Sequence, residues 1–128
     1  MKQIINTANA PAPVGPYNQA TAHNGTLFVS GQIALDPKSG ELITRTIEEE
    51  THQVMKNLQA ILTEAGLTFE DVLKCSVFVS DMNNYSRINE VYATYFQEDT
   101  APARELIEVA NLPKFVNIEI SLIAAMKS

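Results

Sequence analysis

The sequence predicts an α+β fold, a two-layer sandwich in which two helices cover one face of a mixed five- to six-stranded sheet. Two segments carry apolar residues at the three- and four-residue spacing of amphipathic helices, and several other runs alternate with the period of a strand. Along the chain the order is strands, helix, strand, helix and two strands. Two helices of this length can cover one sheet face and leave the other bare.

Composition limits the class of protein. The chain has 128 residues, 45% hydrophobic and 19% charged, and we expect one domain over residues 1–128. No apolar run approaches the roughly 18 residues of a membrane span, and the first residues lack a signal-peptide pattern. The single cysteine, Cys75, cannot form an internal disulfide, which fits a reducing cytosol. We therefore expect a cytoplasmic protein.

The charge balance argues against nucleic acids and membrane surfaces as partners. The formal net charge is −6, and the nine basic residues are scattered along the chain. Binding to phosphate backbones or anionic lipids depends on clustered lysine and arginine. The expected partner is a small molecule or another protein chain.

The N-terminal segment, residues 1–19, begins with a short apolar stretch and continues into a proline-rich run that ends at Tyr17. The prolines make this segment an extended, stiff arm rather than a helix. Such an arm either holds Tyr17 in a fixed place for a site or simply covers a sheet edge. The residues alone do not decide between the two.

The pair Asn24-Gly25 is the strongest hairpin signal, because a type I′ turn needs positive φ at both central residues. It predicts strands over Gln19–His23 and Thr26–Ile33. Gly31 inside the second strand indicates a bulge or a close approach of a ligand to the backbone. Residues 41–44 are expected to form a further short strand.

The first helix is predicted over residues 46–65. Thr46 with Glu49 three residues later forms a capping-box pattern, and Gly66 is a typical residue to end a helix. One apolar stripe runs along this helix and consists of Ile47, Thr51, Val54, Leu58, Ile61 and Ala65.

The second half of the chain predicts three more strands, over Val72–Val79, Ala103–Val109 and Val116–Ala125. In the first of them, the face toward the helices is expected to carry Leu73, Cys75, Val77 and Val79. The second helix follows residues 81–84, and its inner face consists of Ile88, Val91, Tyr92, Tyr95 and Phe96.

The other face of the sheet is expected to be half polar and uncovered. Its predicted side chains are those of Lys74, Ser76, Phe78, Asn117, Glu119 and Ser121. Such a face favours burial against another copy of the chain, so we expect a homo-oligomer.

Motifs of common cofactor and metal sites are missing from the sequence. The chain has no glycine-rich phosphate loop, no CxxC and no HExxH pattern. His23 lies beside the tight turn and His52 lies off the apolar stripe, so both are expected to be solvated, and no metal site is expected. Cys75 faces the helices and is expected to be inert.

Arg104 and Glu119 each interrupt an otherwise apolar strand. A charge in a strand interior is costly unless it is paired, hydrated or used. One interpretation is a structural ion pair between neighbouring strands or subunits. The other is a site in which Arg104 binds a substrate carboxylate and Glu119 holds or deprotonates a water molecule. Sequence spacing leaves both open, and it does not say whether the two residues of one site come from the same chain.

Six short segments spread over the whole chain match the sequence pattern of one known family. They are Gly15–Tyr17, Phe28–Gln32, Val77–Met82, Asn89–Tyr92, Pro102–Arg104 and Ile118–Ile120. By these segments the chain resembles the RidA/YjgF family of reactive enamine and imine deaminases. The last two segments are the most specific part of the resemblance.

The resemblance implies a chorismate-mutase-like fold assembled as a homotrimer, with the sheets in a central barrel and three clefts between subunits. It implies hydrolytic deamination of 2-imino acids, namely 2-iminopropanoate (a tautomer of 2-aminoacrylate) and 2-iminobutanoate, to 2-keto acids and ammonia. This activity protects pyridoxal-phosphate enzymes and uses no metal or organic cofactor.

The resemblance also implies roles for single residues. Arg104 takes the position of the carboxylate binder and Glu119 that of the acid that positions water. Tyr17 would hydrogen-bond the substrate or the water, and the substrate-binding cleft would also be lined by Ser30, Gly31 and Asn89. Leu106 stands where many members have cysteine, which makes the pocket wall larger and more apolar and leaves the preferred substrate size open.

A function of another class also stays open, a non-catalytic regulatory or interaction module that binds a 2-keto acid in the same clefts. Binding of keto acids without turnover of imines would distinguish it from a deaminase. Ribonuclease activity, which is associated with parts of this family, fits poorly with an acidic chain that has no aromatic and basic patch.

Overall fold

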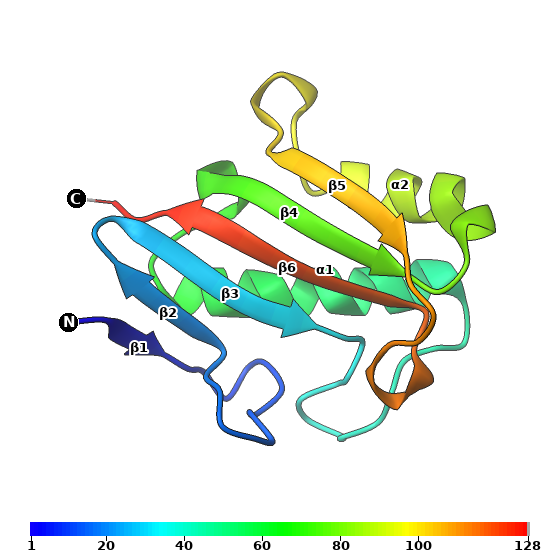
Figure 1. The fold of residues 1–128 in the computed structure, drawn as a ribbon, viewed down its shortest axis with the longest axis horizontal. Coiled ribbons are helices and arrows are strands. Elements are labelled where there is room, and N and C mark those ends of the chain that lie inside the picture. Colours follow the sequence, from blue (N-terminus) through cyan, green and yellow to red (C-terminus); the bar gives the residue numbers. More distant parts are fainter. Residues whose placement is uncertain (128) are drawn as a thin grey trace.

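Across residues 1–127, the part of the chain that the computed structural model describes, six strands form one sheet and two helices pack against one of its faces (Figure 1). The helices are α1 (Ile47–Glu64) and α2 (Tyr85–Ala93), and neither is long and apolar enough to cross a membrane. The strands are β1 (Gln3–Ile5), β2 (Ala20–His23), β3 (Thr26–Gln32), β4 (Val72–Val79), β5 (Ala103–Glu108) and β6 (Ile118–Ala125). The predicted two-layer α+β fold is confirmed.

The strand order of the sheet is β1-β2-β3-β6-β4-β5. Strands β4 and β5 run parallel, and the other neighbours are antiparallel. Parallel neighbours need a crossover connection, and α2 supplies it on the helical face of the sheet. As a result β5 lies at one edge, and β6, the last strand of the chain, lies in the middle (Figure 1).

The hairpin between β2 and β3 has the predicted turn. Asn24 has a φ of 49° and Gly25 a φ of 81°, the positive values that a type I′ turn requires. The sequence does not predict β1, because three residues are too few for a strand pattern. Residues 41–44, expected to form a strand, contribute only a bridge between Leu35 and Leu42.

Helix α1 begins at the predicted cap. The Thr46 hydroxyl accepts a hydrogen bond from the Glu49 amide at 3.1 Å. The Glu49 carboxylate does not complete the capping box, because it pairs with the neighbouring Arg45. Gly66 follows the end of the helix as predicted, with a φ of 77°.

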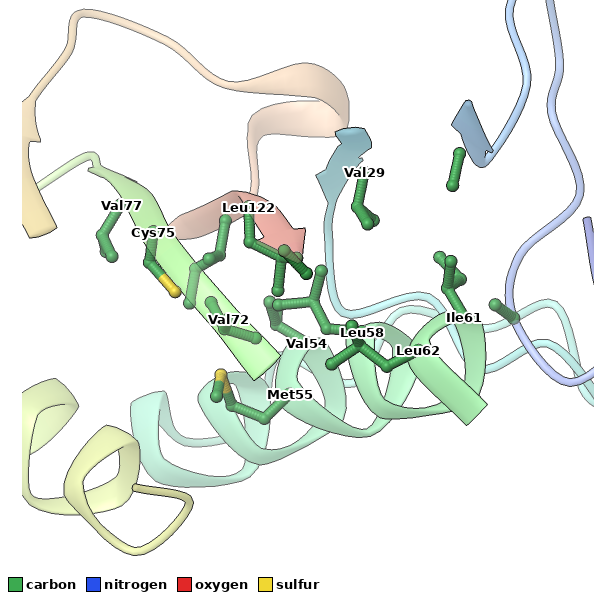
Figure 2. Close-up of a cluster of buried hydrophobic side chains, with 14 of the residues drawn as sticks. Val29, Val54, Met55, Leu58, Ile61, Leu62, Val72, Cys75, Val77 and Leu122 are labelled. Atoms are coloured by element: carbon green, nitrogen blue, oxygen red, sulfur yellow. The ribbon is translucent and has the colours of Figure 1, made fainter. Parts of the chain in front are cut away.

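The core lies between α1 and the sheet. Figure 2 shows side chains of α1 directed toward β3, β4 and β6. Five side chains of α1 in this cluster are fully buried, and they are Val54, Met55, Leu58, Ile61 and Leu62. Burial of such a side chain contributes roughly 1.5–3 kcal/mol, so this contact holds the two layers together.

Strand β4 carries an irregularity at its start that corrects one predicted orientation. Leu73 is expected on the helical face, yet it is 53% exposed, whereas Val72 is buried. The register with β6 shifts between Val72 and Lys74, and this local shift changes which side chain points inward. From Cys75 onward the predicted alternation holds.

The prediction for His52 is wrong. Its ring is half buried, and Nδ1 lies 2.8 Å from the Tyr95 hydroxyl. Tyr95 and Phe96 lie just beyond the end of α2 and form an aromatic cluster with Phe69. His52 therefore takes part in the packing of α1 against the segment that follows α2. His23 is exposed, as predicted.

The sheet face opposite the helices, called here the open face, is turned toward the viewer in Figure 1. It mixes polar side chains with exposed and half-buried apolar ones, which include Ile4, Phe28, Phe78, Ile107 and Ile123. Apolar groups gathered on one such face are typical of an interaction surface.

Candidate functional site

Arg104 lies on the edge strand β5, in register with the buried Cys75, and its side chain reaches α2 on the helical face. Nη1 donates a hydrogen bond to Asn89 Oδ1 at 2.8 Å, and Nη2 donates one to the Tyr85 hydroxyl at 3.0 Å. The guanidinium also stacks over the Tyr92 ring, 4.8 Å from the ring centre. These contacts fix its plane and direction.

The guanidinium of Arg104 is half buried, and no carboxylate of residues 1–127 lies within ion-pair distance of it. An ion pair between Arg104 and Glu119 inside one chain is therefore wrong as an interpretation, and a pair between subunits stays a prediction. A fixed, half-buried guanidinium without a counter-ion is suited to bind a carboxylate through two hydrogen bonds.

Cys75 and Tyr92 lie next to Arg104. Burial raises the pKa of the Cys75 thiol and of the Tyr92 hydroxyl, and the nearby Arg104 lowers each pKa by less. Both groups are therefore neutral at physiological pH, and Cys75 is no thiolate nucleophile, in agreement with its prediction as inert. Among residues 1–127, no three histidine, cysteine or acidic side chains come together as a metal-binding group.

Leu106 follows Arg104 by two residues, so it lies on the same face of β5. It is in register with Val77, is half buried and packs against the core. The structure therefore places an apolar side chain beside Arg104. The effect of this side chain on substrate size stays a prediction.

Glu119 lies near the start of β6 on the open face, because its neighbours Ile118 and Ile120 are buried toward the helices. Its carboxylate lies directly over Gly31, where an added Cβ would be 2.9 Å from Glu119 Cδ. The register of β3 with β6 shifts around Gly31, which confirms the predicted bulge. The space beside this glycine is occupied by the carboxylate of the neighbouring strand.

Burial raises the pKa of the Glu119 carboxyl above its ordinary value. The side chain is half buried, and no cation or hydrogen-bond donor of the described chain offsets the loss of water around it. A carboxylate whose pKa moves toward neutrality is suited to take a proton from a water molecule.

Tyr17 ends an arm that is extended, as predicted. Its side chain is 48% exposed, and its hydroxyl accepts a hydrogen bond from the Val14 amide at 3.4 Å. The buried Gln19 holds the arm, because the two N–H groups of its Nε2 are shared among three carbonyls of residues 7–11 at 2.8–3.2 Å. Sequence reasoning missed Gln19, which gives no signal beyond being a polar residue at the start of a strand.

A cavity of about 150 Å³ opens between this arm, the end of β3 and the turn before β6. Tyr17, Gly31 and Glu119 line it together with apolar side chains. Ser30 lies nearby, and its hydroxyl ties the arm to β3 by donating to the Asn18 carbonyl at 2.7 Å. The volume suits a small acid rather than a large ligand.

The predicted site residues therefore form two groups. The arginine half consists of Arg104, Asn89 and Leu106, on the helical face at the β5 edge. The glutamate half consists of Tyr17, Ser30, Gly31 and Glu119, beside β3 and β6. Because Arg104 and Glu119 point to opposite faces of one sheet, a single chain does not bring the two halves together.

Glu50 was not among the predicted site residues, although it is fully buried in α1 and contacts the start of β6. Asn117, predicted on the open face, instead turns toward α1 and donates from Nδ2 to Glu50 at 2.8 Å. A signal was available, because Glu50 lies three residues after Ile47 and four before Val54, within the apolar stripe.

Replacing Gly31 by alanine is expected to displace the Glu119 carboxylate. The free energy of unfolding should fall by only about 1 kcal/mol, because the flexible end of Glu119 can swing aside. The rate of imine turnover should fall by far more than this small loss of stability can explain. Urea unfolding and turnover are compared with those of Gly15→Ala, whose Cβ would lie at an ordinary 3.7 Å from the Tyr17 ring. Similar losses in the two variants would contradict the expectation.

Compared with the wild type, Glu119→Gln is expected to be more stable at neutral pH than it is at acidic pH. Because its pKa is raised in the folded state, the folded protein holds this proton more tightly than the unfolded chain. The stability that Glu119 contributes should therefore be lost as pH rises from the ordinary carboxyl range through the folded pKa. The free energy of unfolding of Glu119→Gln should accordingly gain on that of the wild type over this range. Urea unfolding at one protein concentration, from about pH 4 to about pH 8, tests this. A difference between the two proteins that is independent of pH would contradict it.

The comparisons with known proteins agree along nearly the whole chain. A family model described as Endoribonuclease L-PSP matches residues 7–126. A RutC family protein of Synechocystis is 52% identical over 97% of this chain and 96% of its own length. The 2-iminobutanoate/2-iminopropanoate deaminase of Mus musculus is 44% identical over 97% of this chain and 91% of its own length.

A solved structure shows the same fold. The crystal structure of E. coli TdcF with bound serine has a TM-score of 0.91 and 38% identity, and the match covers 98% of this chain and 99% of that one. Identity of this extent, over nearly complete chains, establishes common membership. The chain therefore belongs to the Endoribonuclease L-PSP family, the RidA/YjgF family that its motifs resemble.

Proposed function

We propose that this protein hydrolyses 2-imino acids, such as 2-iminopropanoate and 2-iminobutanoate, to 2-keto acids and ammonia, and so protects pyridoxal-phosphate enzymes from 2-aminoacrylate. The observation that carries the proposal is Arg104, fixed by hydrogen bonds and stacking and without a carboxylate partner in the described chain. Such a group binds the carboxylate of a small acid. The identity to the mouse deaminase supports the same class of reaction.

The proposed site is completed by a second copy of the chain in a homotrimer. The open face carries Glu119 among exposed apolar side chains, and Arg104 lies at the opposite face and at an edge. A contact between different surfaces of neighbouring copies can close into a ring. In such a ring Glu119 of one copy meets Arg104 of the next, and the family resemblance implies three copies.

In the proposed reaction the substrate carboxylate binds Arg104, and the imine carbon C2 faces Glu119. Glu119 takes a proton from water as the water oxygen adds to C2, which gives a carbinolamine. The proton passes to the nitrogen, the C–N bond breaks, and ammonia leaves as the carbonyl forms and the hydroxyl proton is lost to water. A protonated imine is already electrophilic, so the protein contributes mainly through positioning. Tyr17 hydrogen-bonds the substrate or the water.

The test generates the imine in place. A serine or threonine dehydratase releases the enamine, and keto-acid formation is timed with and without the protein. We expect an acceleration that is proportional to the protein concentration. Equal rates with and without the protein would refute the proposed function.

The same assay, combined with a calorimetric measurement of 2-keto-acid binding, separates an enzyme from a binding module. Binding of a 2-keto acid in calorimetry, without acceleration of imine hydrolysis, would indicate a non-catalytic regulatory or interaction protein.

The family description names a ribonuclease, but a net charge of −6 disfavours RNA as a partner. We therefore propose a cytoplasmic protein that acts on small acids without a cofactor.

A further inference from the structure

We propose that Glu50 of α1 is a positioning residue for Glu119, an inference that rests on the proposed function. Glu50 is fully buried, and no cation of residues 1–127 pairs with it. Its carboxylate accepts three hydrogen bonds, from the Asn117 amide at 2.7 Å, from Asn117 Nδ2 at 2.8 Å and from the Ile118 amide at 3.2 Å. A carboxylate is acceptor-only, which matches three donors.

These hydrogen bonds support β6 where one neighbouring strand is missing. On one side Ile118 and Glu119 pair with the end of β4. On the other side the pairing of β3 with β6 ends at Gln32 and Ile120, so β3 gives Ile118 and Glu119 no partner. Glu50 therefore supplies, from the helical layer, backbone contacts that the sheet does not.

The segment before these residues is a strained turn. Lys114 and Phe115 have φ values of 55° and 56°, in the left-handed region that non-glycine residues rarely adopt. Phe115 is 82% exposed, so packing of its side chain does not hold this turn. The hydrogen bonds of Glu50 to Asn117, called here the clamp, hold the residue between this turn and β6. A 3.1 Å bond from the Ser80 amide to the Asn117 carbonyl reinforces them. Together they keep the strained turn from shifting the start of β6.

The position of the Glu119 carboxylate depends on this support. It has no hydrogen-bond partner of its own in the described chain, so its place is set by its backbone and by the space over Gly31. A displacement of about 1 Å at a reacting group can cost on the order of a hundredfold in rate. Glu50 itself lies on the helical side and acts only through Glu119.

The test compares Glu50→Ala with Val54→Ala, a substitution of another fully buried residue of the same helix. We expect Glu50→Ala to lower kcat about ten- to hundredfold with KM within about twofold, because Arg104 still binds the carboxylate. Val54→Ala should lose a comparable amount of thermal stability and keep the kcat of the wild type. Equal losses of kcat in both variants, or a rise in KM that accounts for the loss, would overturn the proposal.

A pair of variants tests the hydrogen bonds themselves and serves if Glu50→Ala does not fold. In Glu50→Gln the new side-chain amide nitrogen faces Asn117 Nδ2, so two donors oppose each other in place of the hydrogen bond. The value of kcat should therefore fall. In Glu50→Gln/Asn117→Asp the amide and the carboxylate have exchanged places, so kcat should recover most of the loss. A double variant no more active than Glu50→Gln would count against the role of the clamp.

Amide hydrogen exchange gives a readout that does not depend on turnover. Exchange at residues 118–120 should be faster in Glu50→Ala than in the wild type. The increase should be larger than in Val54→Ala, where the general loss of stability raises exchange throughout the core. If the wild type does not hydrolyse imines, the proposed function fails, and the exchange data alone decide whether Glu50 positions this segment. Unchanged exchange in Glu50→Ala would overturn the positioning role in either case.

Discussion

Replacing Arg104 by alanine is expected to remove nearly all imine hydrolysis. The substitution deletes both hydrogen bonds to the substrate carboxylate and leaves Asn89 without its partner. Truncating one member of a desolvated charge pair costs about 2–5 kcal/mol. The value of kcat/KM should therefore fall by about 30-fold to several thousandfold, as measured by keto-acid release in the dehydratase-coupled assay.

Arg87 provides the matched control for this prediction. It binds Glu48 through two hydrogen bonds, of 2.6 and 2.7 Å, but the pair is exposed. Arg87→Ala should change kcat/KM by less than about twofold, because exposed ion pairs contribute little. Arg104→Lys should restore only part of the activity, since lysine keeps the charge but lacks the planar fork. Wild-type activity in Arg104→Ala would contradict the assignment of the carboxylate to Arg104.

Mixing two inactive variants is expected to restore activity. Arg104→Ala lacks the arginine half and Glu119→Gln lacks the functional group of the glutamate half, and each variant should be inactive alone. If each site takes its halves from neighbouring copies, co-expression in equal amounts gives about a quarter of sites with both residues intact. The measured quantity is the turnover of the purified mixed oligomer relative to the wild type.

The control for the mixing experiment is wild type co-expressed with a chain that carries both substitutions. Sites between copies predict about a quarter of wild-type activity in this mixture as well, whereas sites within one chain predict about half. Native mass spectrometry establishes that mixed oligomers have formed. Inactivity of the mixed single variants, with half activity in the control, would place both residues of a site in the same chain.

Elements that depend on neighbouring residues were predicted correctly from the sequence. The cap at Thr46 and the glycine at position 66 bound α1 within a residue or two, and Asn24-Gly25 defines the hairpin. Each is set by hydrogen bonds and φ preferences within a few residues. β1 and the orientation of Leu73 were not predicted, because the first exists only through pairing with β2 and the second follows from a shift against β6.

The candidate site shows the same division. Arg104 and Glu119 could be singled out because a charge in an apolar strand is costly without a partner or a use. Gln19 and Glu50 could not be assigned their contacts, since their partners lie 9 and 67 residues away along the chain, outside any local pattern. A buried polar side chain needs partners, but the sequence does not say which ones.

The sequence by itself determined the fold class, the family motifs and the two charged residues on which the proposed chemistry depends. Only the tertiary structure decided that these residues lie on opposite faces of one sheet. The reason is strand register: Arg104 is in register with Cys75 and Glu119 with Phe78, which point to opposite sides of β4. Register depends on pairing between distant segments, so the need for a second copy of the chain becomes apparent only in the folded molecule.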